Sequence, residues 1–303
     1  MPVIKPAGLR RGDSIGVISP AGPLDETGLQ SGIEILESSG FKVRLAHHVY
    51  SRLDYLAGED EARLEDLHGM FRDSDIKAVF CARGGYGTTR LLDKIKYDLI
   101  RQNPKILVGY SDITALLLAI QKRTGLITFH GPVVRELASG HQGNYDNLIS
   151  LLSSDKPLKL SLAKGNVLIP GRATGSLIGG NLSLICHLIG TPFLPSLDGC
   201  ILFMEDREEP LYRIDRMLTH LKLSGQLGGL SGLVAGKFEE CGDTSTINGL
   251  LMDVLSDLDI PIATGLEVGH GHKNLSLPLG LPTELDTDRL TLSVTEVAVE
   301  DSP

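Results

Sequence analysis

A single serine, Ser111, lies in VGYSDITALLLAI (108–120), between a short apolar run and a pattern typical of a helix. If KILVGY (105–110) forms a strand, Ser111 occupies the turn between strand and helix, where a hydroxyl can act as a nucleophile. The amide N–H of Asp112 would lie at the helix N-terminus, where unpaired donors and the helix dipole favour a developing oxyanion. The pattern departs from the nucleophile elbow G-x-S-x-G because its fifth position is Ile113. A helix N-cap remains the alternative interpretation of this serine.

A glycine-rich loop, ARGGYGTTR (82–90), directly follows the apolar segment IKAVFC (76–81). Its spacing is neither the dinucleotide fingerprint G-x-G-x-x-G nor a Walker loop, which disfavours a dinucleotide-dependent enzyme. Either the loop is only a tight turn after a strand, or an amide of Gly84 or Gly85 supplies a second oxyanion donor. If the two strands are neighbours in one parallel sheet, this loop and the turn at Ser111 lie at the same edge.

A serine nucleophile needs a base, and nine histidines are available. His130 in TFHGP and His270 in VGHGH are each next to a glycine, which indicates close packing or a turn. His270 and His272 could form half of a metal site, but no third ligand is evident. The constrained context HGHKNLSLPLG favours His270 as the base.

An imidazole base needs a carboxylate to orient it. FMEDREEPLYRIDR (203–216) supplies several acidic residues. Glu205 ends the apolar run ILFM, so a strand would carry it to the edge of a sheet. Glu205 is therefore the best candidate, with Glu208 and Glu209 as alternatives.

The first half of the chain alternates between strand-like and helix-like segments, which predicts a parallel sheet covered on both faces. Residues Leu29, Ile33 and Leu36 illustrate the helical spacing. The predicted strands are 14–19, 41–45, 76–81 and 105–110, and the predicted helices are 25–39, 59–72 and 113–120.

The pattern changes after residue 140. We predict an N-terminal domain over 1–150, a linker over 151–172, and a C-terminal domain over 173–303. In the last domain, 200–205 and 232–238 are typical of strands, and TELDTDRLTLSVTEV is typical of a hairpin.

Composition limits the class of protein. The 303 residues carry a net charge of −9 and are 42% hydrophobic, as in ordinary globular proteins. An acidic chain without a long apolar segment is not expected to bind nucleic acid or membranes, and we expect a cytoplasmic location. Four widely spaced cysteines predict buried thiols rather than zinc ligands.

Seven segments of the sequence, taken in order, resemble the signature blocks of the LD-carboxypeptidase family. These are cytosolic serine peptidases that recycle murein peptides. The segments are YLAGEDEARLEDLH, CARGGYGTTRLLD, PKILVGYSDITALL, TFHGPVV, IGGNLSL, LFMEDREEPLYRIDRML and GHGHKNLSLPLG.

The resemblance implies an α/β fold, with a flavodoxin-like N-terminal domain, a smaller barrel-like, β-rich α+β domain, and a site at their junction. It implies a triad of Ser111, Glu205 and His270, with no metal or cofactor. The amides of Asp112 and of Gly84 or Gly85 would form the oxyanion hole. It also implies a homodimer.

The implied reaction is release of the terminal D-alanine from a murein tetrapeptide. Arg83 is a candidate for holding the free carboxylate of such a substrate. One alternative is a self-immunity hydrolase of the microcin C type, whose adenine would stack on an aromatic residue such as Tyr86 or Tyr212, because the chain has no tryptophan. A non-catalytic ligand-binding module is the other alternative.

Overall fold

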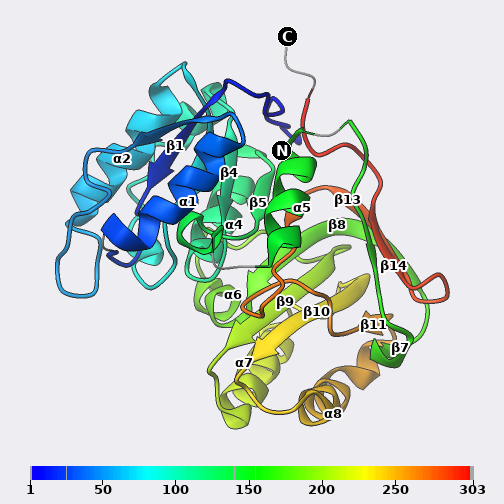
Figure 1. Cartoon of the computed structure of the whole chain (residues 1–303). Coiled ribbons are helices and arrows are strands. Elements are labelled where there is room, and N and C mark those ends of the chain that lie inside the picture. Colours follow the sequence, from blue (N-terminus) through cyan, green and yellow to red (C-terminus); the bar gives the residue numbers. More distant parts are fainter. Residues whose placement is uncertain (1, 25, 139–140, 154, 301–303) are drawn as a thin grey trace.

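A six-stranded sheet forms the N-terminal part of the computed structural model, which describes residues 2–24, 26–138, 141–153 and 155–300 (Figure 1). The order β12-β5-β4-β3-β1-β2 contains five parallel strands in the flavodoxin-like order 2-1-3-4-5, and β12 pairs antiparallel with β5. These strands are β1 (Ser14–Ile18), β2 (Lys42–Leu45), β3 (Ile76–Cys81), β4 (Ile106–Gly109), β5 (Thr128–His130) and β12 (Leu277–Leu279).

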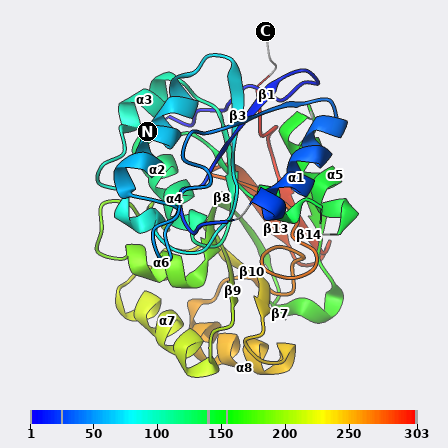
Figure 2. The same ribbon diagram turned by 60° about the vertical axis from the view of Figure 1, so that its left-hand side comes forward.

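Helices cover both faces of this sheet, as the apolar strands require. Figure 2 shows α1 (Glu26–Ser38) and α5 (Gln142–Ser153) on one side, where their leucines and isoleucines join one core cluster. The other side carries α2 (Asp60–Arg72), α3 (Tyr97–Gln102) and α4 (Ile113–Thr124), which contribute to the second cluster. Residue 25, where a helix is predicted to begin, lies outside the described residues.

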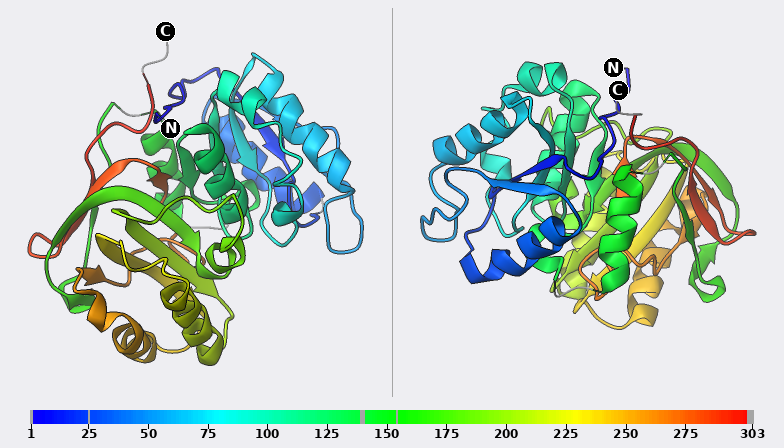
Figure 3. Two further views of the ribbon diagram at one scale, coloured as in Figure 1. Left: turned by 180° about the vertical axis from the view of Figure 1, so that it is seen from behind. Right: turned by 45° about the horizontal axis from the view of Figure 1, so that its top comes forward.

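An eight-stranded mixed sheet forms the rest of the chain, in the order β6-β14-β13-β8-β9-β10-β11-β7. Its two edge strands, β6 and β7, follow each other along the chain with only the 3-10 helix η3 (Lys164–Asn166) between them, so the sheet curls round (Figure 3). Its strands are β6 (Lys159–Ser161), β7 (Val167–Ile169), β8 (Arg172–Asn181), β9 (Ile201–Arg207), β10 (Gly232–Glu239), β11 (Ile262–Ala263), β13 (Pro282–Asp286) and β14 (Thr291–Val294).

Three helices accompany the second sheet. α7 (Leu211–Leu223) and α8 (Thr244–Leu255) lie on its side away from the first sheet, and α6 (Leu182–Leu188) lies next to α4 (Figure 2). The remaining 3-10 helices are η1 (Thr88–Arg90), η2 (Val134–Glu136) and η4 (Ser256–Leu258). Within the described part of the chain, no helix is long and apolar enough to span a membrane.

The two sheets meet at α4, which is buried along most of its length between β4 and β5 on one side and β8 and α6 on the other. A Cβ at Gly180 would lie 2.6 Å from the Thr114 side chain, so only glycine lets β8 approach the first turn of α4 this closely. The next residue, Asn181, donates its N–H to Thr114 Oγ1 at 3.1 Å. This contact sets the ends of β8 and β9 against the turn that precedes α4.

The predicted α/β fold, with a flavodoxin-like sheet and a second β-rich part, is confirmed. The segment 151–172, predicted as a linker, holds the end of α5, β6, η3 and β7. β12 returns from residue 277 to the first sheet, so the first sheet includes a strand from beyond residue 173. The four cysteines are buried and unpaired; they are Cys81, Cys186, Cys200 and Cys241.

Candidate active site

Ser111 lies in the turn between β4 and α4, as the sequence indicates. Its φ is 63°, in the left-handed region that L-residues other than Asn and Asp rarely adopt. This conformation costs roughly 1–2 kcal/mol relative to right-handed backbone. Backbone strain of this kind is common where function fixes the direction of a side chain, and here the hydroxyl faces a cavity.

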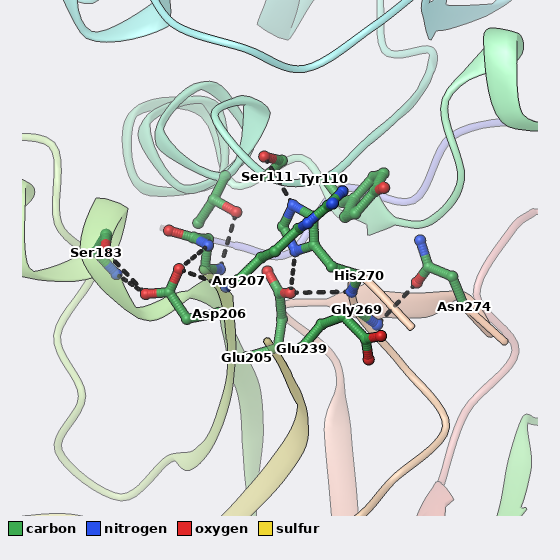
Figure 4. Close-up of polar contacts among 12 residues, drawn as sticks. Tyr110, Ser111, Ser183, Glu205, Asp206, Arg207, Glu239, Gly269, His270 and Asn274 are labelled. Atoms are coloured by element: carbon green, nitrogen blue, oxygen red, sulfur yellow. Dashed lines mark hydrogen bonds and ion pairs between the residues drawn. The ribbon is translucent and has the colours of Figure 1, made fainter. Parts of the chain in front are cut away.

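His270 and Glu205 complete a chain of hydrogen bonds that begins at Ser111 (Figure 4). His270 Nε2 is 3.1 Å from Ser111 Oγ, and His270 Nδ1 is 2.6 Å from Glu205 Oε2. The same carboxylate oxygen also accepts the backbone N–H of His270 at 3.2 Å. Glu205 is fully buried, whereas a tenth of the His270 side chain is exposed at the cavity.

The second sheet brings Glu205 to this place. Glu205 is the parallel register partner of Asn181, whose N–H is bound to the first turn of α4. The loop that carries His270 approaches closely because Gly269 has a φ of 110°, and a Cβ there would lie 2.6 Å from Glu205 Oε2. Asn274 Oδ1 accepts the Gly269 N–H at 2.9 Å and holds the loop.

The ring of Tyr110 packs against the imidazole of His270, and His130 packs against Tyr110 in turn. The ring of Tyr110 lies 4.8 Å from that of His270, and its hydroxyl donates to Glu136 Oε1 at 2.8 Å. Beneath Tyr110 lies His130, which is fully buried and makes edge contacts with Tyr110 and Phe203. Burial, together with the charge of nearby His270, lowers the pKa of His130 to about 3, so its ring is neutral. His130 does not line the cavity beside Ser111, so it is not placed to act as the base.

Three backbone amides near the serine have no described acceptor. No described residue accepts the N–H of Asp112, Gly84 or Gly85, and the two glycines line the cavity with Ser111. Asp112 holds the glycine-rich loop in place, since its side-chain Oδ2 accepts the Thr88 N–H at 2.9 Å and its backbone carbonyl accepts the Thr88 hydroxyl at 2.6 Å. The cavity wall thus includes two glycine residues whose amides have no described acceptor, and the amide of Asp112 directly follows Ser111 in the chain; an oxyanion hole uses donors of this kind.

A Gly84→Ala variant is expected to lose roughly tenfold or more in kcat/KM while remaining folded. The backbone of Gly84 has no left-handed φ, so alanine is tolerated there, but its Cβ would lie 3.1 Å from Ser111 Cβ and 3.3 Å from Oγ. The nucleophile would have to shift by a few tenths of an ångström. Steady-state kinetics measure the loss in kcat/KM, and thermal unfolding shows whether the variant is folded. The control is Gly249→Ala, whose new Cβ would have no heavy atom within 4 Å. A folded Gly84→Ala protein with undiminished kcat/KM would contradict the assignment.

The cavity beside Ser111 has a volume of about 300 Å³ and is strongly polar. Three arginines and one acid are among the residues that line it. The full lining is Arg83, Gly84, Gly85, Tyr110, Ser111, Arg135, Glu136, Arg207 and His270.

Arg83 therefore lies where the sequence suggests, and one of its N–H groups donates to the Pro23 carbonyl at 2.5 Å. Tyr86 does not line this cavity; it is half-exposed and packs edge-on against Tyr55 with ring centroids 5.6 Å apart. Tyr212 is also exposed and contacts Arg216 instead.

The alternative acids do not contact His270. Glu208 has a φ of 56°, so the chain leaves the strand geometry there, and its side chain pairs with Arg207 at 2.8 Å. Glu209 pairs with Arg213 at 3.4 Å. Of the three candidates, Glu205 alone is placed at the imidazole by the structure.

The electrostatics suit a base that is held by a carboxylate. Burial is the largest single effect and lowers the pKa of His270, but the hydrogen bond and charge of Glu205, together with the charges of Glu136 and Asp206, outweigh it. The net effect places the pKa of His270 above its ordinary value of 6.5. Across the described ranges, no three His, Cys, Asp or Glu residues gather as a metal site.

Several residues at the site were not predicted from the sequence. Arg207 lies two residues beyond Glu205 on β9, so the period of a strand could have placed both on one face. Tyr110 precedes the nucleophile and could have been considered from its position alone. The approach of Arg135 and Glu136 depends on the return of the chain after β5, which no local pattern reveals.

Comparisons with known proteins agree with this geometry. The family model described as the LD-carboxypeptidase N-terminal domain matches residues 15–131, and the one described as the C-terminal domain matches residues 174–285. A probable murein peptide carboxypeptidase of Bacillus subtilis is 40% identical over 308 residues, covering 98% of this chain and 96% of that protein. The murein tetrapeptide carboxypeptidase of Pseudomonas aeruginosa is 34% identical over 292 residues, covering 91% of this chain and 94% of that protein.

A solved structure, microcin C7 self-immunity protein MccF in complex with aspartyl sulfamoyl adenosine, superimposes with a TM-score of 0.92. It is 28% identical and covers 98% of this chain and 100% of that one. The fold and the matches together define a serine carboxypeptidase, a hydrolase. The chain belongs to the LD-carboxypeptidase family.

Proposed function

We propose that this enzyme releases the terminal D-alanine from murein tetrapeptides by cutting an L-to-D amide bond, through an acyl-enzyme on Ser111. The observation that carries the proposal is the hydrogen-bonded series from Ser111 Oγ through His270 to buried Glu205, next to unpaired amides. Two named murein peptide carboxypeptidases among the relatives support the choice of substrate.

In the acylation step, Ser111 Oγ attacks the scissile carbonyl carbon while His270 Nε2 takes the hydroxyl proton. Glu205 keeps Nδ1 protonated and stabilises the imidazolium. The amides of Asp112 and of Gly84 or Gly85 would bind the negative charge that forms on the carbonyl oxygen. The C–N bond then breaks as His270 returns the proton to the leaving amine of D-alanine.

In the deacylation step, water attacks the ester carbon and gives a proton to His270. The C–O bond to Ser111 then breaks, and the serine recovers its proton. Arg83 is proposed to bind the free carboxylate of the substrate, because a guanidinium fork matches a carboxylate.

The direct test is incubation with the tetrapeptide L-Ala-γ-D-Glu-diaminopimelate-D-Ala and detection of free D-alanine by mass spectrometry. The epimer that ends in L-alanine is the matched control substrate. A fluorophosphonate probe should also label Ser111 and no other residue. Release of L-alanine as fast as D-alanine would contradict the proposed specificity.

The pH dependence of kcat/KM follows from His270. A general base must be neutral to accept a proton, so activity should rise with pH as His270 loses its proton. Because the net effect of Glu205 and the neighbouring carboxylates raises the pKa of His270, the midpoint of this rise should lie above 6.5. Measuring kcat/KM between pH 5 and 9 checks this, and a midpoint below 6.5 would be inconsistent with Glu205 as the partner.

The second candidate is a hydrolase that acts on an aminoacyl-sulfamoyl nucleotide. It is favoured by the close superposition on MccF, whose solved structure holds aspartyl sulfamoyl adenosine. Against it, the chain has no tryptophan, and Tyr86 packs on Tyr55 outside the cavity. Offering both substrates and comparing kcat/KM separates the two functions.

We further propose that the enzyme works in the cytoplasm as a homodimer, as the family resemblance implies. Light scattering of the purified protein would measure the assembly, and fractionation of expressing cells would measure the location.

A further inference from the structure

The cavity beside Ser111 presents more positive charge than recognition of one carboxylate needs. Arg83, Arg135 and Arg207 line it together with a single acid, Glu136, although the whole chain has a net charge of −9. Guanidinium groups pair best with carboxylates. A murein tetrapeptide supplies one carboxylate on its leaving D-alanine and one on its γ-linked D-glutamate, so a lining with three arginines has room for a further carboxylate on the residue between them.

Two of these arginines form one wall of the cavity. Arg135 donates its backbone N–H to Ala82 at 3.2 Å, which places Arg135 beside the segment of Arg83. Arg83 leads directly into Gly84, which lies against Ser111. This wall borders the glycine amides and suits the carboxylate of the leaving residue.

Glu136 is the last residue of η2 and Arg207 the last residue of β9, and both lie near Tyr110 at the cavity. The hydroxyl of Tyr110 donates to Glu136 Oε1 at 2.8 Å. The charge of Arg207 acts on the same phenol, and Figure 4 shows its side chain running from β9 past His270 toward Tyr110.

Both side chains line the cavity; burial raises the pKa of Glu136, so a cationic group on a ligand would favour its charged form. Within the described residues, Glu136 and Arg207 form no ion pair with each other, and Arg207 instead pairs with Glu208 at 2.8 Å and Glu240 at 3.6 Å. Both of those acids are 60% exposed, and exposed ion pairs are weak. Arg207 can therefore exchange them for a ligand carboxylate at small cost.

We propose that Glu136 and Arg207 select a substrate whose acyl-side residue ends in an amino-acid head, an ammonium and a carboxylate on one carbon. The inference rests on the proposed function, and makes these two residues its specificity determinants. Glu136 binds the ammonium and Arg207 binds the carboxylate. Diaminopimelate ends in such a head, whereas lysine ends in an ammonium alone.

Three tetrapeptides that end in D-alanine test this. They differ only in the third residue, which is meso-diaminopimelate, the same residue with its side-chain carboxylate amidated, or L-lysine. The wild-type kcat/KM should favour the free acid by roughly tenfold to a hundredfold, the usual effect of one charged hydrogen-bond pair.

Variants then assign the preference to the two residues. Arg207→Gln should bring the free-acid peptide to within about threefold of the other two, because only that peptide has the carboxylate. Glu136→Gln should slow all three peptides by a similar factor, because all keep the ammonium and glutamine still accepts from Tyr110. Arg213→Gln, which removes another half-exposed arginine from a surface ion pair, should retain the wild-type preference.

Equal rates for the three peptides with wild-type enzyme would overturn the inference and leave the proposed function standing. A folded Arg207→Gln protein that keeps the preference would also overturn it. If that variant does not fold, Arg207→Lys must still prefer the free acid over the amide. If none of the peptides releases D-alanine, the proposed function fails and the inference fails with it.

Discussion

A Ser111→Ala variant is expected to fold normally and to release D-alanine roughly 10⁴- to 10⁶-fold more slowly than the wild-type enzyme. The substitution removes the attacking atom but little else. Ser111 Oγ contacts His270 Nε2 at 3.1 Å and otherwise borders the cavity, so no packed apolar group is lost. Alanine meets the same penalty at a φ of 63°, so the free energy of unfolding should change by less than about 0.5 kcal/mol.

A Ser111→Gly variant distinguishes the catalytic effect of the hydroxyl from the effect of backbone strain on stability. This variant should be as inactive as Ser111→Ala. Glycine adopts a positive φ without steric cost, which stabilises the folded state, but it also raises the conformational entropy of the unfolded chain. The net gain in the free energy of unfolding should be about 0.5–1 kcal/mol. Product release by mass spectrometry and urea unfolding give the two readouts. A folded Ser111→Ala protein that works at the wild-type rate would show that another residue forms the acyl-enzyme.

The first sheet could be predicted from the sequence because its parallel strands are buried on both faces and are joined by amphipathic helices. The predicted strand 76–81 agrees with β3 residue for residue. α5 was not predicted, because QGNYDN is typical of a turn. Its helix is stabilised by tertiary packing, in which Leu148, Leu151 and Leu152 are buried against the first sheet.

β12 illustrates a second limit. Its three residues include a proline, and only pairing with β5, about 150 residues earlier in the chain, makes them a strand. A segment so short has no periodicity of its own, so neither its strand nor its place in the first sheet could be read locally.

The candidate site also contains residues that the sequence predicts and contacts that it does not. Ser111 was indicated by its place between a strand and a helix, and the resemblance pointed to His270. The acid remained open because Glu205, Glu208 and Glu209 are close in sequence. The structure separates them through the backbone, since β9 stays extended to Arg207 and then turns at Glu208 with a φ of 56°. The link from Asp112 to Thr88 joins two loops 24 residues apart, which no local pattern predicts.

Glu205→Gln is expected to reduce kcat/KM by about 10³- to 10⁴-fold, the effect of removing the orienting carboxylate from a triad of this kind. Glu205 Oε2 accepts both the ring Nδ1–H and the backbone N–H of His270. An amide group in its place either turns its NH₂ toward Nδ1, which favours the wrong tautomer, or offers an uncharged acceptor to the imidazolium. Because the hydrogen bond and charge of Glu205 raise the pKa of His270, the residual activity should also rise at lower pH than in the wild type.

The two neighbouring acids provide the controls for this prediction. Glu208→Gln and Glu209→Gln should keep kcat/KM within about threefold, because neither side chain contacts the imidazole: Glu208 forms an exposed, weak pair with Arg207, and Glu209 pairs with Arg213. Kinetics over a range of pH values on the three variants, each checked by circular dichroism, measure both the rate and the midpoint. If the large loss and the shifted midpoint occur in either control instead of in Glu205→Gln, the carboxylate that orients His270 during turnover is not Glu205.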